Sequence, residues 1–156
     1  MNYGKKMKEI RQNNSLTQQD IAKLLNIARS TYKQYETQYD IMPIIHLNTF
    51  CNHFNLSIDY ILGLTANSHY SKSIKEIDLT TSGSRIKTLR KEHKLTQERL
   101  AKKLNIANTM LCEYEKGHYV ISTATLYALA RLFNVSCDYI LGKTNILHPI
   151  KEVVQS

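Results

Sequence analysis

Five polar side chains crowd into one short stretch of the sequence, ARSTYKQYE at residues 28–36. Arginine can bond guanine through two hydrogen bonds and glutamine can do the same with adenine, each pairing giving about 1–3 kcal/mol of discrimination between bases. Any surface helix has a polar face, but these side chains gather near one end of the segment, which favours nucleic-acid binding. They are Arg29, Ser30, Thr31, Lys33 and Gln34.

The surroundings of this stretch occur twice in the chain. LTQQDIAKLLNIA at residues 16–28 returns as LTQERLAKKLNIA at residues 95–107, and a single shift aligns Gly4 to Thr65 with Gly83 to Thr144. The shared residues fall in three blocks: this segment, a YE dipeptide and a closing FN.S.DYILG.T. The repeat predicts two similar units in tandem.

Apolar residues in each copy recur at helical spacing, and no run alternates as a strand does. Thr17 and Thr96 are placed to cap a second helix, and Asp20 completes a capping box in the first copy. Asn26 and Asn105 then suit a left-handed turn into a third helix. The predicted fold is all-α, with two tandem five-helix helix-turn-helix domains.

The pattern LTQxxLAxxLN[IV]xxxxxxxYE, followed by a helix and N[VL]SxDYILG, resembles the phage-repressor and Cro-type helix-turn-helix family, also called lambda-repressor-like or Xre-type. The resemblance implies that the helix at residues 28–36 enters the major groove, with Arg29, Ser30 and Gln34 at base-contacting positions. It also implies a phosphate contact for Gln18, at a helix N-terminus that already favours an anion.

The second copy is less polar where the first is most polar. Met110, Leu111 and Cys112 interrupt its third helix, and the segment has lost positive charge. It either reads a different half-site, with Glu113 accepting a hydrogen bond from cytosine, or contacts protein; we favour DNA. Its candidate contacts are Gln97, Asn108, Thr109 and Glu113.

The resemblance further implies an ion pair in each copy between the first and third helices. The pairs are Arg11 with Glu36 and Arg90 with Glu115, and their main role is to fix the angle between the two helices.

Relatives usually carry glycine two residues after that glutamate. The second copy keeps it as Gly117, but the first has Gln38. A nonglycine residue in a left-handed cap costs about 1 kcal/mol. The sequence therefore predicts a different loop shape in the first copy.

The chain is basic, with 21 Lys and Arg, 13 Asp and Glu and a net charge of +8 over 156 residues. This favours a polyanionic partner, because binding releases counterions from nucleic acid. No apolar run approaches the ~20 residues of a membrane span, and the N-terminus lacks the apolar core of a secretory signal. We expect a soluble, cytoplasmic protein with no membrane partner.

Chemistry other than binding has little support. Cys51, Cys112 and Cys137 form no CxxC pair and are expected to be buried thiols. His46, Cys51 and His53 match no zinc spacing. Paired carboxylates, an activated nucleophile and a glycine-rich phosphate loop are lacking, so we expect no enzyme, no metal, no cofactor and no effector pocket.

The predicted domains are an N-terminal DNA-binding domain at 1–65, a polar linker at 66–82, a C-terminal domain at 83–144 and an apolar tail at 145–156. The linker allows a short helix around residues 73–79. With an r.m.s. span of roughly 20–25 Å, it would let one chain occupy two half-sites, while a homodimer stays equally open. The tail is expected to pack on a domain or a second chain through Ile146, Leu147, Ile150, Val153 and Val154.

Together these features predict a sequence-specific regulator of transcription that binds double-stranded DNA. A bacterial or phage repressor acting by promoter occlusion fits best. The alternative is an interaction protein that reuses the fold, such as an antitoxin or an inhibitor of a nucleoprotein complex, with the C-terminal domain contacting its protein partner.

Overall fold

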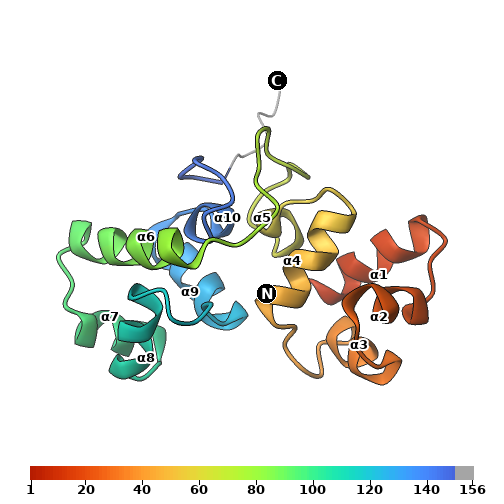
Figure 1. Cartoon of the computed structure of the whole chain (residues 1–156), viewed down its shortest axis with the longest axis horizontal. Coiled ribbons are helices and arrows are strands. Elements are labelled where there is room, and N and C mark those ends of the chain that lie inside the picture. The colour runs from red at the N-terminus through yellow and green to blue at the C-terminus, as the bar shows by residue number, and fades with distance from the viewer. Residues whose placement is uncertain (150–156) are drawn as a thin grey trace. The chain divides into compact units, whose positions relative to one another are not determined.

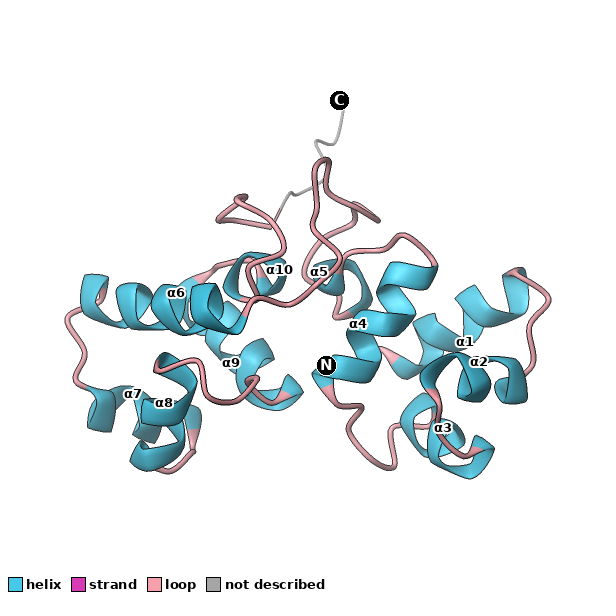
Figure 2. Ribbon diagram, in the orientation of Figure 1, coloured by secondary structure: helices cyan, strands magenta, loops and turns pink. Residues whose placement is uncertain are grey.

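The computed structural model of the chain describes residues 1–149, which are helices and loops without a strand (Figures 1 and 2). Within this range the chain forms two compact units, Met1–Tyr70 and Ser71–Pro149. Each contains five helices, which confirms the predicted all-α fold. None of the described helices is long and apolar enough to cross a membrane.

The two units repeat the same order of helices. The first contains α1 (Gly4–Asn13), α2 (Gln18–Leu25), α3 (Arg29–Glu36), α4 (Ile44–His53) and α5 (Ile58–Ile61). The second contains α6 (Leu79–Glu92), α7 (Gln97–Leu104), α8 (Asn108–Glu115), α9 (Thr123–Phe133) and α10 (Cys137–Ile140).

Local hydrogen bonds set the ends of the helix-turn-helix segments as predicted. The Thr17 side chain accepts a hydrogen bond from the Asp20 amide, and the Asp20 carboxylate accepts one from the Thr17 amide, which completes the capping box. Thr96 caps α7 through its hydroxyl. Asn26 and Asn105 end α2 and α7 in the left-handed conformation, both with φ 55°. Each third helix therefore starts three residues later, at Arg29 or Asn108, on a new axis.

The core of the first unit lies where α2 packs against α3 and α4, while α1 packs on α3 and α5 packs on α4. Its fully buried side chains include Met7, Tyr32, Leu47, Phe50 and Ile61. Because α3 buries the face that contains Tyr32, its opposite face is exposed to solvent.

The residues between the repeats are bonded to the units on either side. Ser57 donates its amide hydrogen to the Ser68 carbonyl, and the Tyr70 hydroxyl donates to the Asp59 carboxylate at 2.7 Å. On the other side, the amides of Ile74 and Asp78 donate to the Lys143 and Leu141 carbonyls. Both ends of the predicted linker thus have fixed contacts within their own units.

The short helix allowed around residues 73–79 is absent from the structure. Residues 73–78 are nonhelical, because the amides of Ile74 and Asp78 bond to a neighbouring segment and not along their own chain. The Asp78 carboxylate accepts a hydrogen bond from the Thr81 amide and so starts α6 at Leu79.

The part of the tail that the structure describes lies against the second unit. The Leu147 carbonyl accepts a hydrogen bond from the Ser136 amide at 2.8 Å, and Ile146 is half-buried. The predicted contacts of Ile150, Val153 and Val154 lie outside the described residues.

The cysteines follow expectation at two of three positions. Cys51 and Cys137 are buried, but Cys112 is only half-buried. Its place on the outer side of α8 explains the difference, since the core side of that helix is formed by Leu111 and Tyr114.

Candidate nucleic-acid interface

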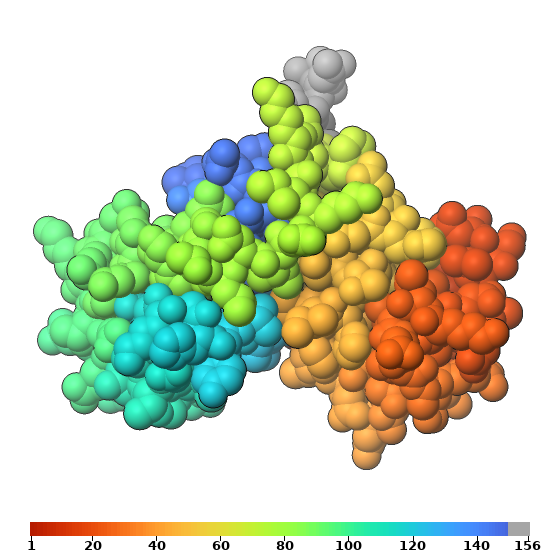
Figure 3. Space-filling model, in the orientation of Figure 1, coloured from red at the N-terminus to blue at the C-terminus, as the bar shows by residue number. Residues whose placement is uncertain are grey.

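The polar end of α3 points away from the core of the first unit. Tyr32 and Glu36 form the buried side of the helix. The residues predicted to contact DNA lie on its other side. In the space-filling view the orange segment that contains α3 lies at the surface of its unit (Figure 3). Arg29, Ser30, Lys33 and Gln34 are exposed, and Thr31 is half-buried.

A buried ion pair holds α3 against α1. Arg11 donates to both carboxylate oxygens of Glu36, at 3.0 Å from Nε and 2.8 Å from Nη2, and its Nη1 donates to the Leu16 carbonyl at 2.9 Å. Burial raises the pKa of the Glu36 carboxyl, but the hydrogen bonds and the positive charge of Arg11, together with hydrogen bonds from neighbouring side chains, bring that pKa below its ordinary value. The carboxylate therefore stays charged and keeps the angle between the helices.

The second unit repeats this arrangement almost atom for atom. Arg90 donates to Glu115 at 2.8 and 3.0 Å and to the Leu95 carbonyl at 2.9 Å. Both predicted ion pairs are thus present in the structure.

The glutamines at the start of α2 and α7 are close to the same glutamates. Gln97 donates to Glu115 at 3.2 Å, and the Gln18 amide lies 3.5 Å from Glu36. Each glutamine is therefore oriented at the N-terminal end of its helix and is only half-buried.

A surface cleft of about 570 Å³ separates the start of α2 from the start of α3. It combines the exposed guanidinium of Arg29 with the side-chain amides of Gln18 and Gln19 at the N-terminal end of α2, where the helix dipole adds positive potential; the Arg11 guanidinium in its wall is paired with Glu36. This donor set suits a phosphate oxyanion. The residues that form it are Arg11, Leu16, Thr17, Gln18, Gln19 and Arg29.

The corresponding face of the second unit differs in chemistry. Asn108 and Thr109 are exposed at the start of α8, followed by Met110, which is 42% exposed. Glu113 accepts a hydrogen bond from His118 Nδ1 at 2.7 Å. Since α8 contains no Lys or Arg, its outer surface offers hydrogen bonds and apolar contacts without positive charge.

His118 is the one partner here that the sequence interpretation missed. Its spacing from Glu113 by five residues is too long for a contact along a helix, and the turn after α8 is what brings the two side chains together.

The loop after α3 overturns part of the sequence prediction. Gln38 adopts the same left-handed conformation as Gly117, with φ 59° against 73°. Its side chain explains how, because Oε1 accepts from the Gly4 amide at 2.9 Å and Nε2 donates to the Met1 carbonyl at 3.0 Å. Beyond this position the loops differ by one residue. In the first unit the backbone amide of Asp40 donates to the Gln34 carbonyl, whereas in the second unit the backbone amide of His118, one place earlier in the repeat, donates to the Glu113 carbonyl.

Comparison with known families separates the same two regions of the chain. A family described as "Helix-turn-helix domain" matches residues 4–66, and one described as "Helix-turn-helix" matches residues 86–140. The chain belongs to the phage-repressor type of the helix-turn-helix family. Both helix-turn-helix segments, α2–α3 and α7–α8, fall inside the matched regions.

Individual members of this family are similar over one domain's length. The HTH-type transcriptional regulator ImmR of Bacillus subtilis is 44% identical over 41% of this chain and 50% of its own length. The immunity repressor protein of Bacillus phage phi105 is 39% identical over 43% of this chain and 46% of its own. Antitoxin PezA of Streptococcus pneumoniae is 37% identical over 45% and 44%, respectively. The chain thus spans about half the length of these relatives, whose names describe regulators and an antitoxin and no enzyme.

Proposed function

We propose that the chain is a transcriptional repressor that binds double-stranded DNA in a sequence-specific manner and occludes promoters. The first unit carries the reading, with Arg29, Ser30 and Gln34 at base edges. Thr31, Lys33 and Gln18 bond the phosphates on either side. In the second unit Gln97 bonds a phosphate, while Asn108, Thr109 and Glu113 read a second half-site.

One observation carries this proposal: the exposed polar end of α3 adjoins a cleft lined by Arg11, Thr17 and Gln18. A duplex that places a phosphate in this cleft brings its major groove to the start of α3, because both structures belong to one rigid α2–α3 pair. Resemblance to a named transcriptional regulator and to a phage immunity repressor supports the same function.

The test is selection of bound sequences from random duplexes by the full chain. We expect one enriched sequence, whose affinity falls about a thousandfold between 50 and 200 mM salt if some six phosphates are engaged. If no duplex is preferred over another, the proposal is wrong.

Two substitutions on α3 separate reading from anchoring. Arg29→Ala should relax preference at one base pair by about 1–3 kcal/mol, whereas Lys33→Ala should weaken all duplexes alike and reduce the salt dependence by about one ion. Competition binding with matched and mismatched duplexes measures both. If Arg29→Ala lowered the affinity for every duplex equally, Arg29 would contact the DNA phosphates and not the bases.

A second candidate function rests on the surface of α8. Met110 is 42% exposed and Glu113 is bonded to His118, an arrangement that suits a protein partner as well as DNA. The resemblance to an antitoxin favours the same candidate. In that case Glu113→Arg abolishes activity in cells, and replacing Arg29 and Gln34 has no effect.

A further inference from the structure

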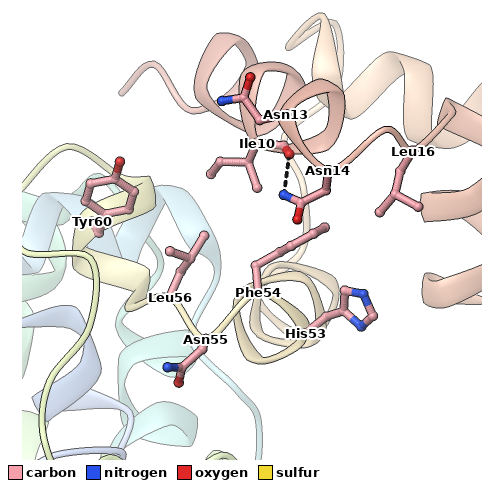
Figure 4. A pocket seen from close by; sticks show the side chains of 9 residues that line it. All are labelled: Ile10, Asn13, Asn14, Leu16, His53, Phe54, Asn55, Leu56 and Tyr60. Atoms are coloured by element: carbon pink, nitrogen blue, oxygen red, sulfur yellow. Dashed lines mark hydrogen bonds between the residues drawn. The ribbon is translucent and has the colours of Figure 1, made fainter.

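A hollow of about 570 Å³ opens at the surface of the first unit, between the ends of α1 and α4 and the start of α5 (Figure 4). Its apolar lining is formed by Ile10, Leu16, Phe54, Leu56 and Tyr60. Phe54 stands in the middle of this group and is only half-buried. Contacts with Phe50 and His53, both at 4.8 Å between ring centroids, hold its ring in place.

In the second unit an aromatic ring occupies the position equivalent to this hollow. There the ring of His93 stacks on Phe133, the counterpart of Phe54, with 4.0 Å between centroids and 22° between the planes. The His93 Nδ1–H donates to the Leu89 carbonyl at 2.8 Å and so anchors the ring. Phe133 is consequently only 8% exposed.

In the first unit Asn14 stands in the place of His93. Its Nδ2 donates to the Ile10 carbonyl at 2.7 Å, which is the same anchoring bond to the same turn of the first helix (Figure 4). The asparagine side chain ends there, however, and provides no ring to cover Phe54. The hollow is therefore the space that an aromatic ring occupies in the second unit.

The polar groups at the edge of the hollow limit which class of ligand it can bind. Among the lining residues there is no Lys, Arg, Asp or Glu, so the site offers nothing to balance a full charge. Amide and imidazole groups lie at the edge of the apolar centre, and those of Asn14 and His53 flank Phe54, where they can bond the edge of a ring that carries nitrogen donors and acceptors. These groups belong to Asn13, Asn14, His53 and Asn55.

We propose that this hollow binds a small, uncharged, planar nitrogen heterocycle, which stacks on Phe54 as the His93 ring stacks on Phe133. The volume accommodates one or two fused rings with room for substituents. The rim amides bond the ring's nitrogen atoms, and the apolar lining covers its faces.

Leu16 connects this site to the candidate nucleic-acid interface, since it lines both the hollow and the cleft beside Arg29. Its carbonyl accepts the hydrogen bond from Arg11, whose other nitrogens hold Glu36. A ligand that shifts Leu16 therefore changes the shape of the cleft. This link between the ligand and DNA affinity rests on the proposed DNA binding, and the ligand then acts as an effector of the repressor.

The chain supplies its own matched variants for the test. Asn14→His fills the hollow with the ring that the second unit uses, and His93→Asn opens the equivalent place over Phe133. Benzimidazole is titrated into the full chain, and NMR shifts of backbone amides and phenylalanine rings report where it binds. Cyclohexanol serves as a nonplanar control of similar size.

In the wild type, saturating shifts should map to the residues around Phe54 with a Kd of about 1 mM, as expected for a fragment of this size. Asn14→His should weaken this binding at least tenfold, and His93→Asn should add a second site around Phe133. Nonsaturating shifts, or unchanged binding by either folded variant, overturn the site. Equal binding of cyclohexanol overturns the stacking.

Duplex binding is measured separately, on the selected sequence. Saturating benzimidazole should change the affinity of the wild type at least threefold and that of Asn14→His not at all. An unchanged wild-type affinity overturns the link to DNA. The NMR titration needs no DNA, so failure of the proposed function and failure of the ligand site are distinguishable.

Discussion

Replacing Glu36 with glutamine should unfold the first unit selectively. The side chains of Arg11 and Glu36 are only 10% and 3% exposed, so the change leaves a guanidinium ion buried without its counterion. Losing one partner of a buried pair costs about 3–5 kcal/mol. A domain of this size has a total stability of only about 5 kcal/mol or a little more, so most of it is lost.

Hydrogen exchange read by mass spectrometry is the suitable assay. The chain has no tryptophan and ten tyrosines spread over both units, so fluorescence does not report one unit alone. Peptides from α1–α5 should exchange about 140-fold to 4000-fold faster in Glu36→Gln, since each 1.4 kcal/mol is a factor of ten. Peptides from α6–α10 should not change.

Three variants serve as controls. Glu9→Gln makes the same charge change at an exposed position of α1 and should stay within about 0.5 kcal/mol of wild type. Glu115→Gln should move the loss to the second unit. Replacing both partners, Arg11→Met with Glu36→Leu, should restore most of the stability because no charge is left buried. Exchange less than tenfold faster in Glu36→Gln, or equal effects of Glu9→Gln, would refute the reasoning.

The same pair predicts a dependence on pH. The pKa of Glu36 is lower in the folded unit than its ordinary value: burial raises it, but the hydrogen bonds and charge of Arg11, together with hydrogen bonds from neighbouring side chains, lower it further. The stabilisation is therefore complete above the ordinary glutamate pKa of about 4.3 and is lost as pH falls through the lower, folded value. In Glu36→Gln this acid-dependent step should be missing from the stability profile.

Two further substitutions test single features of the fold. Gln38→Gly should change the free energy of unfolding by less than about 0.5 kcal/mol. Glycine removes the strain of the left-handed backbone, but the hydrogen bond from the Gly4 amide is lost. A clear increase in stability would show that the Gln38 side chain contributes little. Thr17→Ala should cost about 1 kcal/mol and speed amide exchange in the first turn of α2, and unchanged exchange there would contradict the cap.

The loop after α3 shows why one prediction from the sequence was wrong. The cost of a left-handed glutamine is a local property and could be estimated from the residue type alone. The bonds that offset it run from Gln38 to Gly4 and Met1, more than thirty residues away, and depend on how α1 packs beside the loop. The contact of His118 with Glu113 likewise depends on the turn after α8.

What the sequence by itself determined is the local part of this protein: the tandem repeat, the five helices of each unit, the caps at Thr17 and Thr96 and the left-handed turns at Asn26 and Asn105. These depend on bonds between residues at most a few positions apart, which residue type and spacing reveal. Only the tertiary structure decided that Phe54 is left uncovered while Phe133 is not, although the Asn14–His93 difference stands in the sequence. Whether one ring covers another depends on how closely helices from distant parts of the chain approach, and only tertiary packing sets the distance between them.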